Sequence, residues 1–496
     1  MPVKYLAPFI AVMALFVLVV AGCGGGGTTG GGLPQTTGQV DGYIYVSAVQ
    51  ALTARATGGT PAVGAQVHVA DQPLSAVTDS SGYFLLTGVA TGAHTLVVSL
   101  AGYQALQIPV TVVANQTTRI SSSGTLTPAA RKWTIMVYMN ADNNLEQYGI
   151  ENMNQMESVP DNDQVAVLVQ FDRSPAYDTS NGNWVGAKRF LVRHDNDMTT
   201  INSTLLDDLG STDMGVPSTL SDFIAWGEQL YPAEHYMVVL WDHGSGWRAS
   251  SVVTGFTRGI SYDDSSGHYL RTTDLPGGLT ASSPIDIVAM DACLMQMMEV
   301  DYQIRNQCRY VVASEEDVPG DGYPYQTWLA DLAANPSMTP AAFADAIAHD
   351  TVNYYASSAS YVVHSVVDTG QLEGVASALD QFASAMIAAA GASPAGFATA
   401  RSTAESYADY DFKDIIDYAN KVKANVTDAT VRSTANSLIS AVQGAVVSNY
   451  TSRSNSHGLS IYVPTAASYN QVSATYIPLG FASATHWNEW LAAQRQ

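Results

Sequence analysis

Two residues of this 496-residue chain have the types and settings expected of a thiol-based catalytic pair. His243 follows the apolar run MVVLW, in the string WDHGSGW, and Cys293 follows IDIVAM, in the string MDACLM. A thiolate is a strong nucleophile, and an imidazole can take up a proton or supply one to a leaving group. The pair therefore predicts nucleophilic attack by sulfur, with histidine as the proton carrier.

Both residues follow runs that have the pattern of buried strands. In open α/β sheets, ligands bind beyond the carboxyl ends of the strands, so this is where reactive side chains are expected. We also expect a helix to start just after Cys293, and its dipole would lower the pKa of the thiol. Most histidines and buried cysteines are structural, so position alone does not decide the matter.

The other cysteines offer an alternative role for Cys293. The chain has three cysteines, and Cys293 and Cys308 could form a disulfide in an exported protein. The helix expected between them makes a close approach of their Cα atoms unfavourable. We therefore favour a free thiol and keep the disulfide as the alternative.

The elements that must position the pair are those of an α/β domain over residues 130–496. Continuous apolar runs alternate with helical stretches, which predicts a mainly parallel sheet covered on both faces. The helical patterns lie at Leu220–Leu230, at Met295–Arg305 and over much of the chain after Thr339. The expected strands are Trp133–Met139, Val165–Phe171, Tyr236–Trp241, Ile285–Met290 and Tyr310–Ala313, with further candidates at Tyr361–Val367 and Leu459–Val463.

Residues 37–127 have a different pattern, with short alternating strands separated by turns such as Asp79–Gly82. This spacing predicts a small all-β sandwich. The strings PAVGAQVHV and VTDSSGYFLLTGVATGAHTLVVSLAGY resemble the carboxypeptidase regulatory-like domain. No cluster of histidines, cysteines or paired acids suggests chemistry there, so we interpret the region as a spacer or docking module.

The N-terminus has the layout of an export signal over residues 1–22. Lys4 precedes an apolar run that ends in Val20-Ala21-Gly22-Cys23, a string that resembles the lipobox of bacterial lipoproteins. That resemblance implies cleavage before Cys23, its lipidation, and anchoring in the bacterial cell envelope, in the outer membrane if the host has two. Residues 23–36, rich in Gly and Thr, would then be a flexible tether. A membrane-spanning helix and a plain secretory signal are the alternatives.

Six strings between Lys132 and the C-terminus resemble segments of clostripain-family cysteine peptidases and occur in the family order. They are KWTIMVYMNADNNLE, VVLWDHGSGW, ISYDDSSGHYL, IDIVAMDACLM, VVASEEDVPGDGYPY and SHGLSIYVP. The resemblance implies a caspase-like α/β/α sandwich and a cysteine-type endopeptidase in which His243 and Cys293 are catalytic. It also implies that the backbone N–H groups of Gly244 and Cys293 bind the oxyanion.

The same resemblance implies cleavage after Arg, with Lys as the second candidate, in protein or peptide substrates. Asp291 and Asp321 would line the pocket for the basic side chain, since such a pocket needs a carboxylate. The alternatives are that Asp291 caps the helix after Cys293 and that Asp321 is an exposed turn residue. Three other acids, Glu315, Glu316 and Asp317, are further candidates for the pocket. Asp242 has no assigned role, because strand alternation should turn its side chain away.

A formal net charge of -23 repels phosphate backbones, so we expect no nucleic-acid partner. No CxxC or HExxH pattern indicates a zinc site, and the chemistry requires no cofactor. Calcium is compatible with the oxygen-rich strings Asp142-Asn143-Asn144 and Asp263-Asp264, and some family members depend on it. Capping and turn formation are the favoured interpretation of both strings.

Two further hypotheses remain open from the sequence. Some members of the family cut themselves between the His and the Cys, and Arg248, Arg258 and Arg271 lie in that interval. The chain could also be a catalytically silent caspase-like module for surface binding or adhesion, although the presence of both His243 and Cys293 speaks against this.

Overall fold

The computed structural model describes residues 36–46, 60–100, 102–120, 124–127, 130–248, 259–358 and 361–494. The predicted signal, Cys23 and nearly all of the tether lie outside these residues. Within the described ranges, no helix combines the length and the apolar character needed to cross a membrane. The chain divides into two compact units, one with most residues up to Gly124 and the other with the chain from Thr125.

The first unit consists of two β-sheets, as predicted for the β-rich N-terminal region. One has the order β2-β1-β5, with β8 and β9 also paired to β1, and the other has the order β4-β3-β6-β7. Alternate residues are buried in strands such as β3, because successive side chains point to opposite faces. The strands are β1 (Thr37–Val46), β2 (Thr60–Pro61), β3 (Gln66–Val69), β4 (Ser75–Val77), β5 (Tyr83–Ala90), β6 (Gly92–Ser99), β7 (Leu106–Val112), β8 (Thr117–Arg119) and β9 (Gly124–Leu126).

The second unit is built on a nine-stranded sheet of order β13-β12-β11-β10-β14-β17-β18-β19-β21. The five central strands, β11 to β18 in this order, are parallel, and the strands outside them are antiparallel. The strands are β10 (Arg131–Ala141), β11 (Val165–Arg173), β12 (Gly186–Leu191), β13 (Thr204–Gly210), β14 (Ala233–Trp241), β17 (Ile285–Asp291), β18 (Cys308–Ala313), β19 (Val363–Asp368) and β21 (Val446–Thr451). The five apolar runs from Trp133–Met139 to Tyr310–Ala313 form the parallel core, and the candidate at Tyr361–Val367 corresponds to the antiparallel strand β19.

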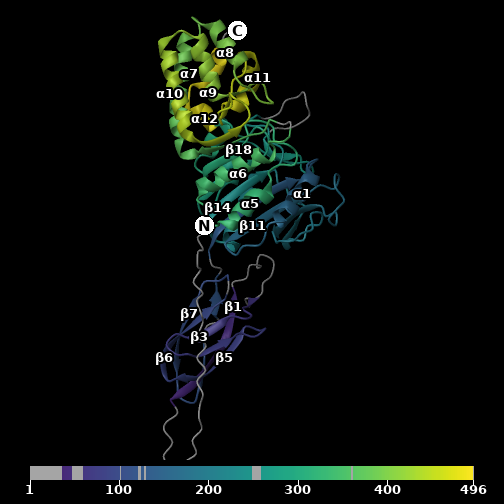
Figure 1. Cartoon of the computed structure of the whole chain (residues 1–496), viewed down its shortest axis with the longest axis vertical. Coiled ribbons are helices and arrows are strands. Elements are labelled where there is room, and N and C mark those ends of the chain that lie inside the picture. The colour runs from purple at the N-terminus through teal and green to yellow at the C-terminus, as the bar shows by residue number, and fades with distance from the viewer. Residues whose placement is uncertain are drawn as a thin grey trace, which may run out of the picture. The chain divides into compact units, whose positions relative to one another are not determined.

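Helices cover both faces of this sheet, as the α/β/α prediction requires. Helices α1 (Glu146–Glu157), α5 (Tyr325–Ala334) and α6 (Pro340–Tyr354) pack on one face (Figure 1). Helices α2 (Pro217–Leu230), α3 (Leu275–Gly278), α4 (Met298–Ile304) and α7 (Leu372–Ala389) belong to the core on the other. A short 3-10 helix, η1 (Thr369–Gln371), precedes α7. The helices that follow α7 in the chain are α8 (Pro394–Thr403), α9 (Ile415–Asn425), α10 (Ala429–Ala445), α11 (Ala466–Tyr476), α12 (Gly480–Ala484) and α13 (Trp487–Ala493). Those labelled in Figure 1 lie near the C-terminus.

Two short sheets complete the unit. Strand β15 (Ile260–Asp263) pairs with β16 (His268–Leu270), and β20 (Phe412–Asp414) pairs with β22 (Ser460–Tyr462). The strand predicted at Leu459–Val463 therefore exists, but it lies outside the main sheet. Strands β12, β13 and β21 were not predicted, because polar or charged residues interrupt their apolar pattern.

Candidate active site

The carboxyl ends of the central strands open on a cleft of about 870 Å3. Its walls come from the segments after β10, β14, β17 and β18, from Tyr177 and the β15 region, and from a stretch before β20. The aspartates that line it are Asp242, Asp264, Asp291, Asp317 and Asp409. No lysine or arginine of the described chain lines the cleft, so its surface is strongly acidic.

His243 and Cys293 both line this cleft, as their positions after adjacent strands predicted. Strands β14 and β17 are parallel neighbours, and Trp241 at the end of one pairs with Asp291 at the end of the other. The following residues are therefore carried to the same sheet edge. A Cβ atom on Gly244 would lie 2.4 Å from the carbonyl oxygen of Cys293 and 2.9 Å from its backbone nitrogen. His243 and Cys293 thus belong to backbone segments that contact each other directly.

The segment after Cys293 differs from the prediction, because no helix starts there. Leu294 has φ +63°, a left-handed conformation that is costly for a branched side chain. The backbone N–H of Leu294 donates to Glu316 O at 3.1 Å, and that of Gln296 donates to Ser314 O at 2.9 Å. These bonds tie the segment to the chain after β18, so helix α4 begins only at Met298. The expected effect of a helix dipole on the thiol is therefore wrong.

The surroundings of the Cys293 sulfur favour the protonated thiol. Burial, and then the nearby Asp317 carboxylate, raise its pKa to about 12. The sulfur accepts a hydrogen bond from the backbone N–H of Val318 at 3.3 Å. Cys293 and Cys308 are both free, so the disulfide alternative does not hold.

The imidazole of His243 is held by the segment that follows β10. Its Nε2 lies 2.8 Å from Oδ1 of Asn144. An amide oxygen can only accept, so Nε2 carries the proton and Nδ1 is left with the basic lone pair. The ring also meets that of Tyr262 edge to face, with 6.4 Å between centroids. Burial lowers the pKa of His243 below its usual value, so the imidazole is neutral near pH 7.

Asp242 connects three segments of the cleft wall and makes no hydrogen bond to the imidazole within the described residues. Its carboxylate accepts from the side chain of Asn143 at 2.8 Å and from the backbone N–H groups of His243 and Tyr262. The side chain is thus turned away from the ring, as the strand alternation predicted. Its contacts fix the backbone on which His243 stands.

Asp291 lies beneath the cleft and is only 4% exposed. Its carboxylate accepts from the backbone N–H of Tyr323 and from the hydroxyl of Tyr325, both at 3.0 Å. Burial raises its pKa to about 7 in spite of these two donors. Because the following helix begins seven residues later, at Met298, Asp291 does not cap it.

The other acids predicted for the pocket have different positions. Asp321 is exposed in a turn closed by a 2.9 Å bond from Gly322 N to Pro319 O, and its side chain is not part of the cleft wall. Glu315 is buried and accepts from Ser456 Oγ and Gly458 N. Glu316 pairs with Arg453 at 2.7 Å. Asp317 lines the cleft.

Two of the arginines considered for self-cleavage are held in ion pairs. Arg248 lies 2.5 Å from Asp409, and Arg271 lies 2.8 Å from Asp274. Arg258 lies outside the described residues. Sequence reasoning also missed Asn144 and Tyr262 as neighbours of His243, because nothing in their local strings indicates which strand ends become adjacent.

Comparisons with known proteins agree with the predicted family. A model of the clostripain family matches residues 137–493, more than half of the chain, and one of the carboxypeptidase regulatory-like domain matches residues 54–127. Clostripain of Hathewaya histolytica is 28% identical over 216 residues. That match covers 39% of this chain and 41% of clostripain, so it spans less than half of that relative's length.

Solved structures show the same fold. The inactive zymogen of a C11 protease from Parabacteroides distasonis is 22% identical with a TM-score of 0.57, and the match covers 72% of this chain and 99% of that chain. A secreted C11 cysteine protease from Bacteroides thetaiotaomicron, in complex with an irreversible peptide inhibitor, is 20% identical with a TM-score of 0.55 and the same two coverages.

Proposed function

The chain belongs to the clostripain family of cysteine peptidases, and we propose that it is an anchored endopeptidase that cleaves after Arg, with Lys as the second candidate, through a dyad of His243 and Cys293. The observation that carries the proposal is the presence of a thiol and an imidazole in the wall of one acid-lined cleft. An acidic cleft without lysine or arginine in its described wall attracts basic side chains.

The dyad accounts for the chemistry in two half-reactions. As the Cys293 sulfur attacks the scissile carbonyl carbon, its proton passes to Nδ1 of His243 and the carbonyl electrons move to oxygen. When the tetrahedral intermediate collapses, the C–N bond breaks and the imidazolium gives its proton to the leaving amine. Water then attacks the thioester with His243 again as base, which releases the acid and restores the thiol. No step needs a cofactor.

The oxyanion formed in both half-reactions needs hydrogen-bond donors that are already in place. The backbone N–H groups of Gly244 and Cys293 are the candidates, because the two backbones are in contact beside the sulfur. Glycine is required at position 244, since any Cβ would overlap Cys293.

Asp291 is the first candidate for the carboxylate that pairs with the substrate's basic side chain. It lines the cleft two residues before the nucleophile, and it has no cationic partner among the described ion pairs. Asp321 is the second candidate. It would have to act from the outer side of the 319–322 turn, where its charge contributes to a basic side chain only through solvent.

The site of action proposed for the enzyme follows from the N-terminal string. Lipidation of Cys23 would hold the enzyme at the bacterial cell envelope, outside the cytoplasm, and in the outer membrane of a two-membrane host. Residues 23–36 and the β-rich region would separate the catalytic unit from that anchor.

The direct test uses a fluorogenic peptide with a single Arg before the scissile bond. Cys293→Ala should abolish its hydrolysis, whereas Cys308→Ala, which removes the other free thiol, should leave cleavage intact if the protein folds. Undiminished turnover by Cys293→Ala would refute the dyad. A wild-type protein that binds the peptide without cleaving it would instead favour the surface-binding module.

A further inference from the structure

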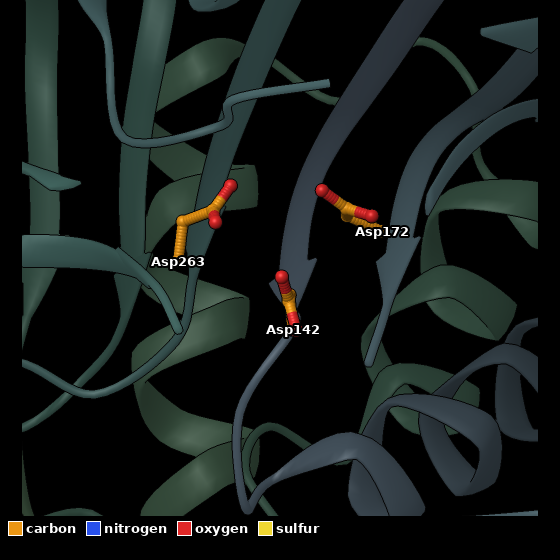
Figure 2. A group of neighbouring side chains, drawn as sticks. All are labelled: Asp142, Asp172 and Asp263. Atoms are coloured by element: carbon orange, nitrogen blue, oxygen red, sulfur yellow. The ribbon is translucent and has the colours of Figure 1, made fainter. Parts of the chain in front are cut away.

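Three buried carboxylates meet behind the wall that carries His243. Asp142 follows β10, Asp172 lies in β11 and Asp263 ends β15, and their exposed fractions are 3%, 2% and 2%. One carboxylate oxygen from each lies within 4.8 Å of the other two. Figure 2 shows the three side chains directed into the same space from three separate elements.

The hydrogen bonds of this cluster leave part of it unsatisfied. Asp263 accepts from the backbone N–H groups of Met214 at 2.9 Å and Ser266 at 2.7 Å. Oδ2 of Asp142 accepts from the backbone N–H of Ser265 at 3.1 Å. The other oxygen, Oδ1 of Asp142, is fully buried and has no hydrogen-bond partner. A buried polar oxygen without a hydrogen-bond partner is costly, so its position indicates a missing ligand.

No basic side chain of the described residues compensates the three carboxylates through an ion pair. Arg173 follows Asp172 directly, but its guanidinium is engaged by Glu146 at 2.6 Å and by Asp178 at 3.4 Å. Arg189, on the neighbouring strand β12, donates to Gln170 at 2.8 Å. The cations nearest in the sequence are therefore committed elsewhere.

We propose that Asp142, Asp172 and Asp263 bind one divalent, oxygen-preferring cation of the calcium and magnesium class. A calcium ion takes oxygen ligands at about 2.3–2.6 Å, so two oxygens on opposite sides of it are about 5 Å apart. Oxygens within 4.8 Å of one another therefore suit a single ion between them. The cluster offers no imidazole or thiolate, which disfavours zinc and copper.

The position of the cluster would couple the ion to the cleft. Asp142 stands two residues before Asn144, which bonds to Nε2 of His243. Asp263 follows Tyr262, whose ring packs against His243 and whose N–H binds Asp242. An ion would therefore tie together the two segments that orient the imidazole, without contact with substrate.

The test compares the EDTA-treated full chain before and after addition of CaCl2 or MgCl2. Bound metal per chain is measured by equilibrium dialysis with elemental analysis, and the melting temperature by calorimetry. We expect one ion per chain and, at saturation about a hundredfold above Kd, a rise of about 5 °C or more. Asp172→Asn should lose the bound ion and the rise in melting temperature. Asp207→Asn, which changes a control carboxylate on β13 of the same sheet, should keep the ion and the rise.

Relief of repulsion should make metal-free Asp172→Asn at least as stable as the metal-free wild type. If that variant fails to fold, Asp142→Asn, which alters the unpartnered oxygen, takes its place. Absence of a bound ion in the wild type, or equal binding by both carboxylate variants and the control, would overturn the proposal. Cys293→Ala should bind the ion like the wild type, so failure of the dyad and failure of this site are distinguishable.

Discussion

The raised pKa of Asp291 predicts that the preference for a basic side chain depends on pH. Only the ionised carboxylate can pair with a guanidinium, and burial places the pKa at about 7. The ionised fraction then rises from about 0.1 at pH 6 to about 0.9 at pH 8. If pairing with Asp291 supplies the selectivity, kcat/KM for an Arg substrate should rise about tenfold across this interval relative to a neutral analogue.

The assay uses two fluorogenic peptides that differ only in Arg or citrulline before the scissile bond. Taking the ratio of their kcat/KM values removes the titration of His243, which both substrates share. Asp291→Asn should give a low ratio that does not change with pH. Tyr325→Phe removes a donor that lowers the pKa of Asp291, so the rise should move to higher pH.

A flat ratio in the wild type between pH 6 and 8 would refute the assignment of Asp291 as the pairing carboxylate. The same conclusion would follow if Asp291→Asn kept the wild-type pH dependence. In that case another acid of the cleft wall, such as Asp317, would have to provide the selectivity.

Two further predictions concern the nucleophile. Gly244→Ala places a Cβ atom 2.4 Å from the carbonyl oxygen of Cys293, so kcat should fall by about a hundredfold or more. Gly374→Ala is the control, because a Cβ atom there meets nothing within 4 Å, and its kcat should be unchanged. Equal activity of both variants would argue against an oxyanion site at this contact. The second prediction is that iodoacetamide labels resting Cys293 about a thousandfold more slowly at pH 7.5 than a free cysteine, because the thiol pKa is about 12 against an ordinary 9. Asp317→Asn should speed the labelling, which is followed by peptide mass spectrometry. Rapid labelling of the wild type at neutral pH would contradict the buried, protonated thiol.

The sequence alone was sufficient to predict the parallel core of the sheet and the residues that follow its strands at their carboxyl ends. Strands such as β14 and β17 are buried on both faces, so their apolar runs predict them directly. Strands β12 and β13 contain charged residues and have no such run. Strand β12 is placed by its pairing with β11, and β13 by its pairing with β12, and no local pattern encodes either pairing.

The helix predicted directly after Cys293 is absent because of contacts with distant parts of the chain. Residues 294–297 have no local feature that forbids a helix, but they pair with Glu316, Ser314 and Ser460 instead. Asp172 was missed for a related reason, since a single acid at the end of the run VAVLVQFDR resembles an ordinary strand end. Its importance arises only where β10, β11 and β15 converge.

The protonation states of the proposed dyad determine how it can act. Burial raises the pKa of the Cys293 thiol to about 12 and lowers that of His243, so both shifts favour the neutral thiol and imidazole over a thiolate–imidazolium pair. We therefore expect the proton to leave the sulfur as the carbonyl is attacked. In the proposed mechanism the negative charge passes to the carbonyl oxygen, so the proposed donors, the backbone N–H groups of Gly244 and Cys293, would supply stabilisation that a protonated thiol needs in order to react.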